Sequence, residues 1–392
     1  MAPVSFIAFQ KELAQRMFTI LILITAVSCN EKRAINTRDK SDGHNLISLA
    51  QRLSIEKQRE YTKVNIINPW QGADNVNMSY YLVRRGSMIP PGIDSSMVIK
   101  VPVRKIVCMS TTHVAMISAL GEENTIAGMS GTGFIYSGDL KIRADEGFIK
   151  DVGYEANLNK ELILKILPDI TMIYGVGSES SGYVGKIEEL GIKVIYNADY
   201  LETDPLGKAE WIKLFGALYC RESMADSIFN AEADAYNNLK LFIRENIDDK
   251  PNVLLGLPFR DTWFISPGNS FISRLIEDAG GNYLWKDTKS SVSMPFGLEN
   301  VYLKAVNADY WINIGTVRTR NEIPAMDLRL SKLPCFRNGR LYNNNNRVTD
   351  SGGNDFWESG TVYPHRVLKD IASIMHPELF PGYKLYYYRK IN

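Results

Sequence analysis

Apolar and polar positions along the chain follow a repeating order of short strands and helices. The segment VPVRKIVCMSTTHVAMISALG starts with a β-branched run from Val101 to Val107, reaches Ser110, and continues as a helical apolar pattern that ends at Gly121. This order predicts a strand, a helix N-cap and a helix. Further along, a helix that stops at Pro168 is followed by a strand from Ile170 to Tyr174. Because short links join these alternating elements, we predict a parallel sheet covered by helices.

The same plan returns after Pro251. NVLLGL predicts a strand, SFISRLIEDAGG predicts a helix closed by glycines, and LENVYLKAVNADYWINIG predicts a helix that leads into a strand. Two segments, ELILKILPDITMIYG and ENVYLKAVNADYWINIG, share a Glu, a Leu-Lys pair, an Asp, an apolar strand and a Gly in the same order. Chance could produce one such match, but the shared order of elements favours two related α/β lobes.

One long helix is predicted between the two halves. Residues 223–247, SMADSIFNAEADAYNNLKLFIRENI, contain no Gly or Pro and keep their apolar side chains at helical spacing. At 1.5 Å per residue this helix would be roughly 35 Å long, about the width of a domain. We therefore expect an N-terminal lobe over residues 56–222, a rigid interlobe helix over 223–247 and a C-terminal lobe over 248–392. Open α/β sheets bind ligands at the carboxyl ends of their strands, so we expect the ligand cleft between the lobes.

Two further strands are predicted ahead of this plan. YTKVNIINPW and MSYYLVRRG are rich in β-branched and aromatic residues and are bounded by turn residues, which indicates a hairpin added to the N-terminal lobe. The sequence assigns no task to this addition.

The first 28 residues have the layout of a secretory signal. Basic residues precede an apolar run of about eleven residues, 17–27, and the small residues Ala26 and Ser28 come just before Cys29. The run is shorter than the roughly 20 residues that a membrane-spanning helix needs. The ending resembles a bacterial lipoprotein signal, which predicts cleavage after residue 28 and lipidation of Cys29. An ordinary signal peptide or a buried helix is the alternative.

Residues 30–54 are polar, rich in Asp, Asn and Ser, and lack a sustained apolar period. We predict that residues 29–55 comprise the lipidated cysteine and a flexible tether. The expected location is the periplasm or cell envelope, with the protein held at the membrane by its lipid.

Composition and charge exclude several classes of protein. The 45 Lys and Arg residues nearly balance the 44 Asp and Glu residues and are interspersed with them, which argues against a nucleic-acid partner. After Cys29 the cysteines are Cys108, Cys220 and Cys335, an odd number without a CxxC pair, which argues against a disulfide framework and a zinc ribbon. The four histidines lack HxxxH or HExxH spacing. Neither a P-loop nor a GxSxG elbow is present, so no catalytic residue and no metal ligand is predicted.

Five segments, read in order from about residue 100 to the end, resemble the substrate-binding proteins of ABC importers for ferric siderophores, haem and cobalamin. They are RKIVCMSTTHVAMISALGEENTIAGMS, VGYEANLNKELILKILPDITMIYG, LGIKVIY, SPGNSFISRLIEDAGGNYLW and SMPFGLENVYLKAVNADYWINIG. The resemblance implies an α/β fold of two Rossmann-like lobes with parallel sheets, joined by one long helix. It also implies a monomer that captures a metal complex in the cleft and delivers it to an ABC importer permease. It implies no cofactor beyond the transported complex, and it leaves siderophore, haem and cobalamin open.

The resemblance also suggests roles for individual residues. Docking onto the permease would use one acid on each lobe, Glu155 in VGYEANLN and Glu299 in PFGLENV. The alternatives are a solvated loop acid for Glu155 and a helix N-terminal acid for Glu299. Aromatic surfaces suit a tetrapyrrole, a corrin or a catecholate, although core packing is the alternative for each ring. The predicted ligand contacts are Thr111, Thr112, Tyr174, Trp263, Asp355, Phe356 and Trp357. Candidates for pairing with an anionic complex are Arg260, Arg318, Arg320 and Arg347.

Two other functions stay open at this point. A zinc or manganese carrier would share the fold, but it requires spaced histidines and carboxylates that the sequence lacks. A lipoprotein enzyme that acts on tetrapyrroles, such as a chelatase, belongs to a different class. Turnover would distinguish that enzyme from a carrier, which binds stoichiometrically.

Overall fold

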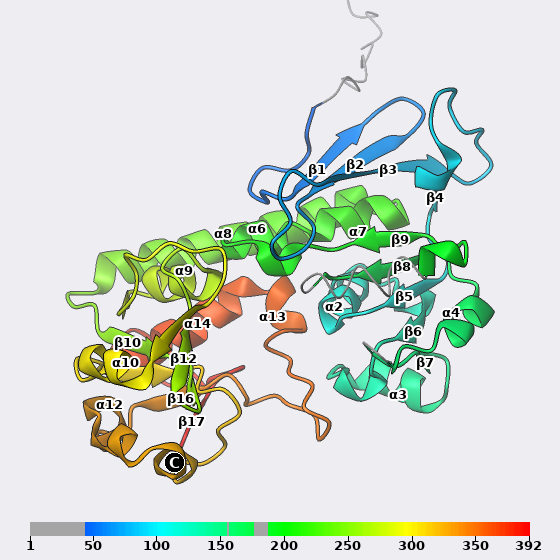
Figure 1. Ribbon diagram of the computed structural model, residues 1–392. Coiled ribbons are helices and arrows are strands. Elements are labelled where there is room, and N and C mark those ends of the chain that lie inside the picture. Colours follow the sequence, from blue (N-terminus) through cyan, green and yellow to red (C-terminus); the bar gives the residue numbers. More distant parts are fainter. Residues whose placement is uncertain (1–43, 155–156, 176–186) are drawn as a thin grey trace, which may run out of the picture. The chain divides into compact units, whose positions relative to one another are not determined.

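The N-terminal lobe is built on a five-stranded sheet in the computed structural model, which describes residues 44–154, 157–175 and 187–392 (Figure 1). The strand order is β7-β6-β5-β8-β9, and all four strand pairs are parallel, as predicted. Three of the strands, β5, β8 and β9, are buried along their whole length, which accounts for their continuous apolar runs. The strands are β5 (Ile106–Cys108), β6 (Ile126–Met129), β7 (Lys150–Asp151), β8 (Ile170–Ile173) and β9 (Val194–Tyr196).

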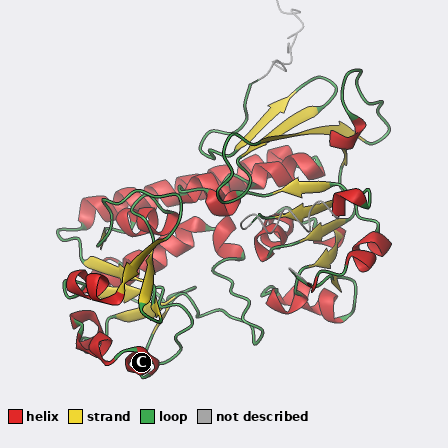
Figure 2. Ribbon diagram, viewed as in Figure 1, coloured by secondary structure: helices red, strands yellow, loops and turns green. Residues whose placement is uncertain are grey.

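Helices cover this sheet (Figure 2), and some of them begin at a capping side chain. The Ser110 side chain accepts a hydrogen bond from the Thr112 N–H (3.3 Å), which confirms the predicted N-cap. The helix before Pro168 ends at Ile166, and Leu167 takes a left-handed conformation with φ of 52°. The helices of this lobe are α2 (Thr111–Ala119), α3 (Gly138–Asp145), α4 (Lys160–Ile166), α6 (Pro205–Ala209) and α7 (Ile212–Tyr219). The 3-10 turns are η1 (Ser95–Met97), η2 (Glu123–Thr125), η3 (Thr132–Phe134) and η5 (Asp199–Leu201).

The C-terminal lobe repeats the plan around a sheet in the order β13-β10-β15-β16-β17, parallel except at β17. An antiparallel sheet, β11-β12-β14, is added to it. The strands are β10 (Asn252–Leu255), β11 (Pro258–Phe259), β12 (Thr262–Ile265), β13 (Asn282–Tyr283), β14 (Met294–Gly297), β15 (Tyr310–Ile312), β16 (Leu341–Asn343) and β17 (Arg389–Lys390). The helices are α9 (Phe271–Asp278), α10 (Leu298–Ala305), α11 (Glu322–Met326), α12 (Pro334–Arg337), α13 (Ser359–Val362) and α14 (Pro364–Met375), with η6 (Leu328–Lys332) and η7 (Pro377–Leu379).

A single helix of 25 residues, α8 (Glu222–Asn246), joins the lobes and agrees with the predicted span to one residue at each end. It packs against α7 of the N-terminal lobe and against α9 and α14 of the C-terminal lobe. Three polar contacts fix it to the C-terminal lobe. Tyr236 OH donates to Asp278 Oδ2 (2.8 Å), Lys240 Nζ pairs with Asp278 Oδ1 (2.8 Å), and Glu232 Oε2 pairs with His365 Nδ1 (2.5 Å). An unbroken helix with contacts in both lobes permits only limited lobe motion. None of the helices in the described ranges is long and apolar enough to cross a membrane.

Residues 53–101 form a mixed four-stranded sheet, the N-terminal sheet. Its strands are β1 (Leu53–Lys57), β2 (Thr62–Ile67), β3 (Asn77–Arg84) and β4 (Val98–Val101). The predicted hairpin is present as the antiparallel pair β2 and β3. The first strand starts at Leu53, inside the range predicted for the tether, because Leu53 and Ile55 alternate into the core. The apolar run 101–107 is divided between β4 and β5, since Pro102 has no N–H with which to continue a ladder.

Two buried carboxylates fasten the chain ahead of β1 to the lobe. Glu210 accepts the N–H groups of residues 48–50 at distances of 2.9, 2.7 and 2.9 Å, and Glu202 accepts those of residues 51 and 52, both at 3.0 Å. Glu202 also accepts the indole N–H of Trp211 (3.1 Å). Burial alone would raise the pKa of Glu210, but the hydrogen bonds from these N–H groups hold it below its usual value. Residues 48–52 are therefore an ordered part of the lobe.

Substitution Glu210→Ala should lower the free energy of unfolding by about 3 kcal/mol, because it removes the acceptor of three backbone N–H groups and one of the acceptors of Lys213, which also donates to the Leu46 carbonyl (3.1 Å). Urea unfolding monitored by circular dichroism measures the change. The control is Glu245→Ala, an exposed position on the same chain, which should change stability by less than about 0.5 kcal/mol. Equal midpoints for Glu210→Ala and wild type would contradict this role for Glu210.

Candidate functional site

A cavity of about 420 Å³ lies between the two lobes. The N-terminal lobe contributes residues at the carboxyl ends of β5, β6 and β8, where an open α/β sheet binds ligands. The C-terminal lobe contributes residues from the loop before α13. The lining residues are Met109, Ser110, Thr111, Met129, Ser130, Phe134, Tyr154, Tyr174, Gly352, Gly353, Asn354 and Trp357. This interlobe cavity is the candidate ligand site.

Aromatic rings from both lobes form much of its wall. Phe134, Tyr154, Tyr174 and Trp357 are 37 to 52% exposed, so each ring has a face available to a ligand. Phe134 and Tyr154 meet edge to face at 6.3 Å between ring centres. Such rings suit a ligand with flat or apolar surfaces, which gains from stacking and from removal of apolar area from water.

Three of the predicted ligand contacts, Thr111, Tyr174 and Trp357, line this cavity. Thr112 is buried beneath them, and its hydroxyl is hydrogen-bonded to that of Ser110 (2.9 Å). The structure therefore brings together only part of the predicted set.

The other three predicted contacts face elsewhere, which corrects the prediction for each. Trp263 is fully buried on β12, where its indole N–H donates to the Leu255 carbonyl (3.0 Å). Phe356 is buried against Tyr388, with ring centres 5.7 Å apart. Asp355 is buried and pairs with Arg347. The loop of Asp355 and Phe356 does reach the cavity through Asn354 and Trp357, but packing within the C-terminal lobe turns these two side chains away from it. Trp263 lies in a strand and not in such a loop.

Several lining residues escaped the sequence analysis. Phe134 and Tyr154 follow β6 and β7, and Met109 and Met129 stand at strand ends. These residues could have been found in the sequence as aromatic or thioether side chains that stand at or just beyond the end of a predicted parallel strand.

Of the two predicted docking acids, Glu299 lies in the first turn of α10 with its side chain 85% exposed. Glu155 and Cys29 lie outside the described residues.

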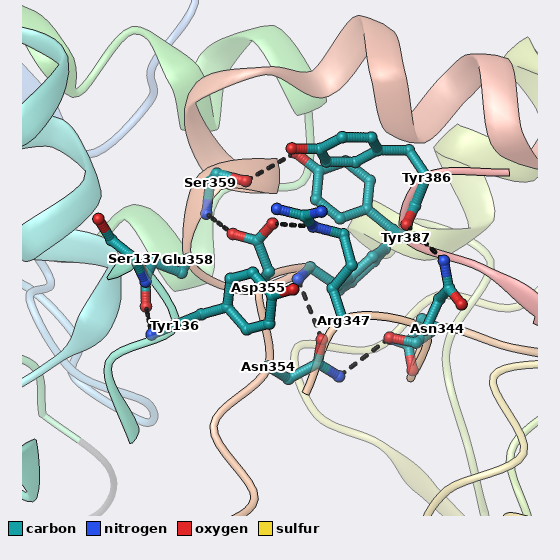
Figure 3. Close-up of polar contacts among 12 residues, drawn as sticks. Tyr136, Ser137, Asn344, Arg347, Asn354, Asp355, Glu358, Ser359, Tyr386 and Tyr387 are labelled. Atoms are coloured by element: carbon teal, nitrogen blue, oxygen red, sulfur yellow. Dashed lines mark hydrogen bonds and ion pairs between the residues drawn. The ribbon is translucent and has the colours of Figure 1, made fainter. Parts of the chain in front are cut away.

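One loop of the C-terminal lobe reaches across to the N-terminal lobe; we call residues 344–358 the interlobe strap. Glu358 accepts the N–H groups of Tyr136 (2.8 Å) and Ser137 (3.0 Å), as Figure 3 shows. The Thr349 hydroxyl donates to the Gly133 carbonyl (2.9 Å). The strap therefore holds the lobes together beside the cavity.

Polar contacts also hold the strap in one conformation. Arg347 pairs with Asp355 (2.6 Å) and stacks between Tyr136 and Tyr386, 4.7 and 4.1 Å from the ring centres. Arg347, Asp355 and Glu358 line a second cavity of about 380 Å³, whereas other strap residues line the first. Different strap residues therefore face the two cavities.

The pKa of Glu358 is raised from 4.5 to about 7, because burial penalises its charged form more than the hydrogen bonds from Tyr136 and Ser137 favour it. A carboxyl whose pKa is higher in the folded state adds stability at low pH and loses it as pH rises. Relative to Glu358→Gln, the wild type should lose about 3 kcal/mol at most between pH 4.5 and 7.5. Urea unfolding of both proteins across this range measures the difference. Parallel pH curves would show that Glu358 does not titrate here.

A cavity of about 630 Å³ lies where β3 and β4 meet β9, but it shares no lining residue with the interlobe cavity and no residue of the C-terminal lobe lines it. Among the described residues, no three His, Cys, Asp or Glu side chains gather in an arrangement that could hold a metal ion. In the interlobe cavity the strand carboxyl ends of the N-terminal lobe face the loop before α13, whereas the second cavity, also lined by both lobes, has helix and loop residues on its N-terminal side.

Comparison with known proteins supports the fold. No family model matches the chain. An uncharacterized lipoprotein of Methanocaldococcus jannaschii is 26% identical over 407 residues, covering 95% of each chain. A periplasmic heme binding protein from Pseudomonas aeruginosa superposes with a TM-score of 0.54 at 17% identity, covering 70% of this chain and 93% of that chain. A Fe3+-Desferal-bound siderophore binding protein from Vibrio cholerae gives a TM-score of 0.52 at 14% identity, covering 69% and 98%. The chain therefore has the two-lobed fold of periplasmic binding proteins, and the α/β prediction is confirmed.

Proposed function

We propose that this protein is a solute-binding lipoprotein that captures an iron-siderophore, haem or corrinoid complex and delivers it to an ABC importer. The observation that carries the proposal is a cavity at strand carboxyl ends, lined by both lobes and walled by exposed aromatic rings. Similar structures in which haem or Fe3+-Desferal is the named ligand support it.

Titration of the purified protein with a ferric trihydroxamate, haem and cyanocobalamin tests the proposal. Trp357 lines the cavity, so binding should quench tryptophan fluorescence at micromolar ligand or below. Trp357→Phe keeps an aromatic surface and should reduce the quenching while binding persists by calorimetry. Absence of binding by all three complexes would overturn the proposal, and metal insertion into a porphyrin would favour the chelatase-like enzyme instead.

The proposal places the protein at the outer side of a membrane, held through lipid on Cys29. The relative described as a lipoprotein supports this location. Metabolic labelling with a radioactive fatty acid should modify the wild type and leave Cys29→Ala unlabelled. A wild type that takes up no label would contradict lipidation.

The proposed protein partner is the importer permease. Glu299 supports this role, because it is exposed on α10 and has only a long ion-pair contact, 3.5 Å to Arg329 Nη1. Arg329 is held more closely by Asp327 (2.8 Å). The Glu299 carboxylate is therefore available to arginines of a second protein. Glu155 is the proposed counterpart on the N-terminal lobe.

A further inference from the structure

We infer that the ligand of the interlobe cavity is a metal complex without net charge, held by aromatic and thioether surfaces and by hydroxyl hydrogen bonds. This inference rests on the proposed function and narrows its ligand class. Neutral complexes are then the expected ligands, and polyanionic complexes such as ferric tricatecholates are not.

The chemistry of the described lining supports the inference. Ser110, Thr111 and Ser130 present hydroxyls, and Asn354 presents an amide. The remaining described lining residues are aromatic rings, thioethers and glycines: Phe134, Tyr154, Tyr174, Trp357, Met109, Met129, Gly352 and Gly353. All of these side chains are neutral at physiological pH.

The four arginines considered as partners for an anionic complex are placed elsewhere. Arg347 faces the second cavity and is paired with Asp355. Arg320 donates to the Phe336 carbonyl (2.7 Å) and stacks on that ring, 4.4 Å from its centre. Arg260 lies over the Phe259 ring in the turn between β11 and β12, and Arg318 is not a lining residue. None of the four arginines that were predicted to pair with an anionic complex therefore lines the interlobe cavity.

Electrostatics then determines which complexes bind well. A complex with several negative charges that enters a partly enclosed cavity loses hydration and requires cations in compensation. The N-terminus of α2 at the cavity supplies a partial charge of only about half an elementary charge. That partial charge and the hydroxyls suit single carbonyl or hydroxamate oxygens, while Met109, Met129 and the rings suit the apolar faces of a neutral complex.

Binding of two ferric complexes to the intact protein tests the inference. A neutral ferric trihydroxamate and a trianionic ferric tricatecholate are titrated at about 20 and 300 mM salt, concentrations at which screening differs strongly. We expect the neutral complex to bind at least tenfold tighter, with a Kd that changes less than twofold with salt. Tighter binding of the tricatecholate, weakened by salt, would overturn the inference and leave the proposed function standing. Failure of both complexes, of haem and of cyanocobalamin would overturn the function as well.

A matched pair of variants isolates the charge. Thr111→Glu and Thr111→Gln place side chains of equal size at the cavity wall and differ only in charge, and both are tolerated in the first turn of a helix. For a neutral complex the two Kd values should agree within about threefold. A Kd at least tenfold weaker for Thr111→Glu than for Thr111→Gln would show that the bound complex is anionic. Circular dichroism of both variants verifies that they are folded.

Discussion

Substitution Gly353→Ala will weaken ligand binding at least tenfold, a loss of about 1.4 kcal/mol. A Cβ at this position would lie 2.1 Å from the Phe134 carbonyl oxygen and 2.6 Å from its carbonyl carbon. These atoms are backbone and cannot rotate away, so the strap must retreat from the N-terminal lobe. Retreat would withdraw Trp357 from the cavity and break the hydrogen bonds from Tyr136 and Ser137 to Glu358.

Fluorescence titration with the complex that binds wild type best gives the Kd. The control is Gly297→Ala, because a Cβ at Gly297 meets no atom within 4 Å and the backbone there has an ordinary φ of −64°. This control should bind as wild type does. Urea unfolding verifies that Gly353→Ala remains folded. If it binds with the wild-type Kd, contact between strap and N-terminal lobe is not required for capture.

Charge reversal at Glu299 should separate capture from delivery. Glu299→Arg removes a carboxylate that is 85% exposed and contributes little within the chain, so ligand affinity should stay within about twofold of wild type. Uptake of labelled ligand by cells that depend on this protein should fall at least tenfold, because a cation would then face the proposed arginines of the permease.

Glu277→Arg is the matched control. Glu277 is also exposed, at 66%, and it also has a long contact with an arginine, 3.6 Å to Arg274, but it lies on α9. Its reversal should leave uptake unchanged. Loss of ligand binding by Glu299→Arg would refute the docking role, and so would unchanged uptake.

The sequence predicts well those elements whose formation depends on residues within or directly beside the element. The span of α8 is one case, because no glycine or proline interrupts it. Its buried face is less well predicted: the apolar spacing pointed to Ile228, Ala231, Ala235, Leu239, Phe242 and Ile243, whereas the structure buries Ala225, Phe229, Tyr236 and Ile243. The start of α2 is another, because the Ser110 cap bonds within its own turn. The parallel order of the sheets follows from the alternation of these elements.

The candidate site was predicted less completely, because side-chain direction in loops and added strands depends on distant contacts. Asp355, Phe356 and Trp357 are consecutive, yet they face Arg347, the core and the cavity respectively. Trp263 is buried because β12 pairs with β14, a partner some thirty residues along the chain. In the same way, a glutamate such as Glu210 is usually exposed. Its burial here depends on N–H groups 160 to 162 residues away in the sequence.

The attachment of residues 48–52 to Glu202 and Glu210 also has a mechanical meaning. These acids flank α6 and precede α7, and α7 packs along the long helix α8. Residues 45 and 46 also bridge to β1, where the Leu46 N–H donates to the Ile55 carbonyl (2.8 Å). Tension applied to the chain ahead of Asn45 would therefore be borne by β1 and, through five backbone hydrogen bonds, by the segment around α6 of the N-terminal lobe. The strap and the strand ends around the cavity take part in none of these contacts. If a lipid on Cys29 holds the protein at a membrane, as proposed above, that attachment would load contacts that none of the described cavity-lining residues makes.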